Sequence, residues 1–134
     1  MHAYDYAFVR AVRVASGDAV TLGVVLQCRQ SRFLGVRWVE ADAGALALDP
    51  GLLASAMRAF EIVARGGDGA GPVGRLPPSE RFHFLTAARS TSLQPSPVRT
   101  GLTDDASGTL DRIARQTRPI LLDPFETGEP AAGV

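Results

Sequence analysis

The sequence of 134 residues contains no lysine and no asparagine, and all fourteen of its basic residues are arginine. The absence of lysine excludes a Schiff-base mechanism and the lysine of a phosphate-binding P-loop. Histidine occurs only at His2 and His83, and cysteine only at Cys28. These three residues cannot close a zinc site of four Cys or His ligands, and one cysteine cannot form an internal disulfide. The composition therefore predicts neither a metal nor a cofactor.

An excess of charge of one sign and long apolar runs are also missing. Fourteen arginines balance fourteen acidic residues, and this net charge of zero counts against binding to nucleic acid or anionic lipid. No apolar run approaches the roughly 18 residues of a membrane-spanning helix. The first residues are not a basic stretch followed by an apolar one, as in a signal peptide. We therefore expect a soluble cytoplasmic protein of one domain.

Three strands are predicted at residues 4–14, 19–29 and 32–39, where β-branched and aromatic residues dominate and turn residues intervene. The short connections between them are typical of an antiparallel meander. In the second strand, alternation predicts one shared face for Val20, Leu22, Val24, Leu26 and Cys28. Cys28 is therefore interpreted as a core residue and not as a reactive thiol.

A helix is predicted at residues 50–65. Asp49 is a typical N-cap residue, and Pro50 suits the first helical position. Apolar residues then recur at helical spacing until Gly66, which is typical of a helix end.

Two shorter helices are predicted in the second half of the chain. Residues 66–77 are rich in glycine and are interpreted as a loop, after which a short helix begins at Pro78. The last helix is predicted within residues 103–116, with Thr103 or Asp104 as its N-cap.

The polar stretch at residues 89–101 reads RSTSLQPSPVRTG. In an extended chain, N–H groups two residues apart point to the same side, so Pro95 and Pro97 remove donors from one side only. The other side can still pair with a neighbouring strand. This spacing predicts an edge strand whose open side is blunted.

Together these elements predict an α+β fold. An antiparallel sheet of about four strands, in the element order β-β-β-α-α-β-α, would be covered by two or three helices. Residues 1–118 would form the domain, and residues 119–134 an extended or disordered tail.

The glycines of the loop, Gly69, Gly71 and Gly74, match the spacing G-x-G-x-x-G. A dinucleotide site requires a strand before this motif and a helix that opens at it, whereas here a helix precedes it. We therefore interpret the motif as a connection. His83 is a candidate general base, and the alternative is a half-buried histidine bonded to the backbone.

Arginines suggest one further kind of site. Arg81, Arg89 and Arg99 would form an anion site if they converged with His83, and Ser90 and Thr91 could then join them. The alternative is that these arginines are solvated or paired with surface carboxylates, which the balance of charge makes easy.

Four segments resemble the bacterial DUF3037 family of unknown function. They read YDYAFVRAVRV, LGVVLQCRQSRFLGVR, GPVGRLPPSERFHFLTAARST and SPVRTGL. They occur in the family's order and spacing across about residues 3–115 of this chain. The resemblance implies no assigned activity. It also implies a partner, because genes of this family often lie beside a gene for a HipA-like kinase-fold protein.

These observations support two functional hypotheses. We expect a non-catalytic accessory protein that interacts with a HipA-like kinase-fold protein, since no complete catalytic set is present. The alternative is a small enzyme or a phosphate-binding domain that uses His83 with Arg81, Arg89 and Arg99.

Overall fold

The computed structural model describes residues 1–13, 15–39, 49–87 and 93–117. These residues form five strands, three α-helices and one 3-10 helix, which confirms the predicted α+β class. In chain order the elements are β1 (His2–Arg13), β2 (Asp18–Cys28), β3 (Phe33–Trp38), α1 (Pro50–Arg65), η2 (Asp68–Arg75), α2 (Pro78–Thr86), β4 (Leu93–Pro95), β5 (Arg99–Thr103) and α3 (Ala106–Gln116). The predicted tail at 119–134 lies outside the described residues.

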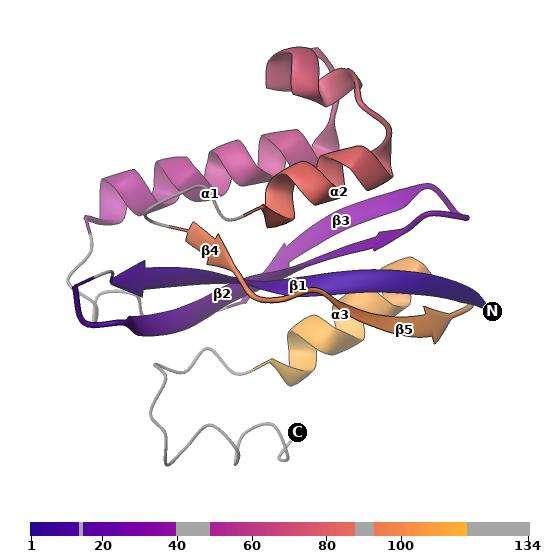
Figure 1. Cartoon of the computed structure of the whole chain (residues 1–134), viewed down its shortest axis with the longest axis horizontal. Helices are drawn as coiled ribbons and strands as arrows, with labels where there is room; N and C mark the ends of the chain where they lie inside the picture. The colour runs from indigo at the N-terminus through magenta and orange to yellow at the C-terminus, as the bar shows by residue number, and fades with distance from the viewer. Residues whose placement is uncertain (14, 40–48, 88–92, 118–134) are drawn as a thin grey trace.

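One antiparallel sheet forms the centre of the fold (Figure 1). Its strand order is β3-β2-β1-β4, and β5 pairs with the other half of β1. The stretch predicted as one edge strand therefore supplies two short strands to the same edge. This division raises the number of strands from the expected four or so to five.

The helices cover both faces of the sheet (Figure 1). α1 and α2 pack on one face, the α1 face, where Val9, Phe60 and Phe82 are buried. α3 packs on the opposite face, the α3 face, where Leu26 and Leu110 are buried. Each large apolar side chain buried in these layers contributes roughly 1.5–3 kcal/mol to the stability of the fold.

A β-bulge divides β2 between the two layers. Val9 pairs with Gly23, but the next β1 residue pairs with Thr21, so Leu22 is an extra residue. Before the bulge, Val20 and Leu22 belong to the α1 face; after it, Val24, Leu26 and Cys28 belong to the α3 face. The prediction that these five residues share one face of the sheet is therefore wrong, because the alternation of side chains between the two faces is interrupted at the unpaired Leu22. Cys28 is nevertheless a core residue, as predicted.

Gly23 allows the indole of Trp38 to lie directly on β2. A Cβ at this position would come within 2.6 Å of Trp38 Cε3 and 2.7 Å of the Arg37 carbonyl oxygen. On its far side, the indole meets the Phe60 ring edge-on, at 5.8 Å between centroids. The glycine thus couples the sheet to α1.

The bounds of α1 agree with the prediction. Asp49 caps it by accepting a hydrogen bond from the Gly51 N–H at 2.9 Å, and Gly66 ends it with a positive φ of 79°. The residues that follow were expected to be a loop but contain η2, a 3-10 helix with a kink at Gly71. Its eight residues form two short pieces on either side of this kink, in agreement with the short runs usual for the tighter 3-10 geometry.

α2 begins at Pro78, as predicted, whereas the N-cap of α3 is Asp105 and not Thr103 or Asp104. Asp105 accepts a hydrogen bond from the Gly108 N–H at 3.0 Å. Thr103 is still the last residue of β5, and its Oγ1 accepts a hydrogen bond from the Asp105 N–H at 2.9 Å. The N-cap of α3 lies later than predicted because Thr103 is still paired with His2 of β1.

Candidate functional site

Arg81 holds together the connection between α1 and α2. Its guanidinium lies against Gly66, where an added Cβ would come within 2.8 Å of Arg81 Cζ. Its Nη1 donates a hydrogen bond to the carbonyl of Leu76, while Nε has no partner among the described residues. The half-buried side chain is therefore packed into the fold and is not presented as an open anion site.

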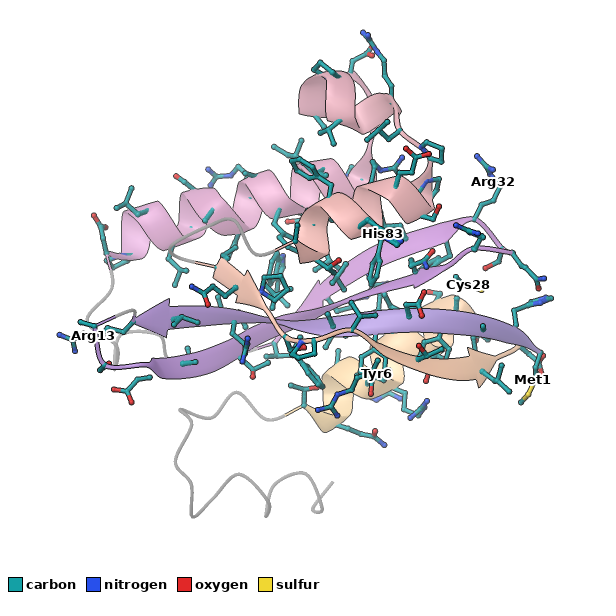
Figure 2. All side chains as sticks on the ribbon, viewed as in Figure 1. Met1, Tyr6, Arg13, Cys28, Arg32 and His83 are labelled. Atoms are coloured by element: carbon teal, nitrogen blue, oxygen red, sulfur yellow. The ribbon has the colours of Figure 1, made fainter. Side chains whose placement is uncertain are left out.

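Arg99 and His83 lie on opposite sides of the sheet. Arg99 Cζ lies 5.8 Å from the centroid of the Phe8 ring, which packs against the α3-face cluster. His83 lies on α2, above the other face (Figure 2). Its exposed ring is edge-on to Phe82. The structure therefore does not bring Arg99 together with Arg81 or His83.

The remaining residues of the predicted anion site, Arg89, Ser90 and Thr91, lie outside the described residues. Arg81 and His83 are two positions apart on α2, and helix residues at this spacing do not face each other. Within the described segments, the residues proposed for that site do not assemble.

A groove of about 320 Å³ opens between α1, α2 and β4, and we call it the α1–α2 groove. Every residue that lines it is apolar. The lining consists of Ala56, Ala59, Phe60, Val63, Phe84, Leu85, Ala87, Leu93 and Pro95. Its volume lies at the lower end of the range typical of ligand pockets, which are usually lined by apolar side chains with a few polar groups.

The groove lies along one wide apolar surface of α1. Six residues of this surface pack in or against the α1-face core: Leu53, Ala56, Met57, Phe60, Val63 and Ala64. Of these, Ala56, Phe60 and Val63 also line the groove, together with the exposed Ala59. Ala56 and Ala59 are too small to fill the space up to α2, and Phe84 on that helix remains 37% exposed.

The lining determines what the groove can do chemically. General acid–base catalysis needs a titratable group, and covalent catalysis needs a nucleophile within reach of a base. The lining side chains contain neither kind of group. The groove can therefore bind apolar groups by desolvation, but its walls cannot perform these reactions.

A second cavity, of about 290 Å³, lies at the N-terminus of α3 and is more polar. Its lining includes His2, Cys28, Asp104 and Asp105. In the described part of the chain, no three or more His, Cys, Asp or Glu side chains are grouped so that they could hold a metal ion. Cys28 is only 1% exposed and packs in the α3-face cluster, so its role here is structural.

Sequence reasoning missed the α1–α2 groove because its walls come from three separate elements. The available signal was the width of the apolar surface on α1, which Ala59 extends. Spacing alone does not tell which part of such a surface another element covers.

The fold and the groove define a small α+β domain with an apolar groove between α1, α2 and β4. No helix in the described segments is both long enough and apolar enough to cross a membrane. The sequence model of the family "Protein of unknown function (DUF3037)" matches residues 6–117, and the chain therefore belongs to this family. Searches of curated proteins and of solved structures found no match.

Proposed function

We propose that this DUF3037 protein is a non-catalytic accessory protein that binds a HipA-like kinase-fold protein through the α1–α2 groove. The observation that carries the proposal is the uniformly apolar lining of the groove. Binding sites are usually concave and lined mainly by apolar side chains. The choice of partner is supported only by the gene neighbourhood that the family resemblance implies.

The groove suits one or two large apolar side chains of a partner. Aromatic and aliphatic anchors that enter a desolvated pocket dominate the energy of most protein interfaces. Ala59 lies at the exposed rim, and Phe84 forms part of the opposite wall. A side chain inserted between them would be covered from both sides and would remove Phe84 from water.

The proposal is tested by co-expressing the chain with the HipA-like protein from the adjacent gene and measuring co-purification. The variant Ala59→Glu places a charge in the groove, and burying an unpaired charge is strongly unfavourable. Its matched control is Ala54→Glu, because Ala54 is also an exposed alanine of α1 but does not line the groove.

We expect the wild type and Ala54→Glu to co-purify with the partner and Ala59→Glu to lose it. Circular dichroism of both variants shows whether α1 remains folded. Absence of a wild-type complex at micromolar concentration would contradict the proposal. Equal binding by Ala59→Glu would exclude the groove as the binding surface.

A further inference from the structure

β5 has one paired edge and one open edge. Phe8 exchanges hydrogen bonds with Ser96, so the even-numbered residues of β1 direct their backbone groups toward β4 and β5. Their partners in β5 are Arg99, Gly101 and Thr103. By alternation, Thr100 and Leu102 direct their N–H and C=O groups away from β1, and no described residue pairs with these groups.

The other outer edges are partly closed by arginine. In β4, Pro95 has no N–H group, and its outward carbonyl accepts a hydrogen bond from Arg10 Nη2 at 3.1 Å. In β3, the outward carbonyl of Val36 accepts a hydrogen bond from Arg37 Nη1 at 3.1 Å. Among the described residues, no side chain caps β5 in this way. One outward carbonyl in each of β3 and β4 is thus occupied, whereas the outward carbonyls of Thr100 and Leu102 on β5 are both open to a partner.

β5 is also accessible, because the helices pack mainly on β2, β3 and β4. Figure 1 shows β5 at the border of the sheet, away from α1 and α2. The Leu102 side chain is 64% exposed and lies across from the exposed Ala3 of β1. An exposed edge with an apolar side chain is a site where another strand can add.

We propose that β5 pairs with the β5 strand of a second copy of this chain, in antiparallel orientation. Charge complementarity favours a second copy: β5 begins with Arg99 and is followed by the exposed Asp105, whereas the neighbouring Asp104 pairs with the N-terminal ammonium of its own copy at 3.1 Å. When two such strands run antiparallel, the cationic start of one lies beside the anionic end of the other. The same arrangement forms twice around a twofold axis.

The backbone restricts the register of this pair. Outward-facing residues must meet outward-facing residues, so the pair can be centred on Thr100, Gly101 or Leu102, and of these only the Leu102 register places Arg99 opposite an acidic residue. In that register the two Leu102 side chains lie side by side, and Arg99 of each copy lies opposite Asp105 of the other, on the same face. The surface is separate from the α1–α2 groove, so this inference does not depend on the proposed function.

Sedimentation of the full chain over a series of micromolar concentrations tests the proposal. We expect a reversible monomer–dimer equilibrium. Arg99→Glu places two like-charged contacts in the dimer, and so does Asp105→Arg. We expect each variant alone to raise the dissociation constant at least about tenfold, which corresponds to about 1.4 kcal/mol.

A mixture of these two variants provides the decisive measurement. In the mixed dimer, the glutamate introduced in one copy meets the arginine introduced in the other. The native Asp105 of the first copy meets the native Arg99 of the second, so both attractive contacts return. We expect the mixture to dimerise about as well as the wild type. Loss of stability in either variant would not be rescued by mixing, so circular dichroism first establishes that both variants are folded. Failure of two folded variants to restore the dimer would overturn the antiparallel pairing.

Leu102→Lys supplies a second variant that does not depend on the charged ends. Its matched control is Leu52→Lys, because Leu52 is equally exposed, at 65%, but lies on α1. We expect only Leu102→Lys to weaken the dimer. A wild type that stays monomeric at every concentration would overturn the proposal. If Leu102→Lys then also lost the co-purifying partner, the edge would be assigned to a strand of that other protein.

Discussion

Ser96 and Phe8 exchange two hydrogen bonds of 2.8 Å, and in one of them the serine hydroxyl replaces a backbone carbonyl. Ser96 N–H donates to the Phe8 carbonyl, while the Phe8 N–H donates to Ser96 Oγ. The Ser96 side chain thus continues the hydrogen-bond ladder of β1 across the gap between the end of β4 and the start of β5. It allows the chain to leave the sheet at Pro97 without leaving Phe8 N–H unpaired.

Ser96→Ala should therefore destabilise the protein, because it removes the only acceptor that the structure shows for the Phe8 N–H. The cost of an unsatisfied donor predicts a loss of about 1–2 kcal/mol in the free energy of unfolding. Urea unfolding measures this loss, and Ser31→Ala, at an exposed turn position, is the control. Equal stability of the two variants would show that water replaces the hydroxyl without cost.

Gly23→Ala should disturb the contact between β2 and Trp38. The new methyl group would overlap both the indole and the backbone oxygen of Arg37, and backbone cannot move aside cheaply. We expect a loss of about 1–3 kcal/mol, as for other overpacked sites. Trp38 is the only tryptophan, so a change in its fluorescence would report the displacement directly.

The control for this substitution is Gly69→Ala. A Cβ at Gly69 would meet nothing within 4 Å, and its φ is not in the positive region. We expect its stability to change by less than about 0.5 kcal/mol. A similar loss in both variants would mean that the close contact with Trp38 is not the cause.

Much of the fold follows from local signals. The α1 helix was predicted correctly because Asp49, Pro50 and Gly66 act within one turn of its ends. The edge position of the stretch around Pro95 was also predicted, since a missing N–H is a property of the residue itself. The divided faces of β2 could not be predicted, because the bulge at Leu22 depends on pairing with β1.

The candidate site was less predictable for the same reason. Arg81 and Arg99 looked alike in the sequence, but one is packed against Gly66 and the other lies over Phe8 on the opposite face. Which face a side chain occupies depends on the completed sheet. The α1–α2 groove likewise exists only once α2 has packed beside α1.

Arg81 and His83 should differ sharply in their effect on stability, although both were candidates for function. Arg81→Lys loses the planar fork that packs on Gly66 and reaches the Leu76 carbonyl. We expect it to lower the free energy of unfolding by about 1–2 kcal/mol. His83→Ala removes an exposed ring and should change that free energy by less than about 0.5 kcal/mol. A large loss in His83→Ala would indicate contacts that the described residues do not show.

Arg10→Met should make the β4 edge more prone to aggregation. Arg10 donates from Nε to the Gln94 carbonyl at 3.2 Å and from Nη2 to the Pro95 carbonyl at 3.1 Å. Methionine retains an apolar stem of similar length but leaves the outward carbonyl open to another strand. We expect a stability loss of about 1 kcal/mol and faster growth of light scattering on mild heating. Arg13→Met is the matched control, because Arg13 is exposed at the end of the same strand and its side chain makes no hydrogen bond or ion pair to the described residues. If both variants aggregated equally, loss of charge and not the uncapped carbonyl would be responsible.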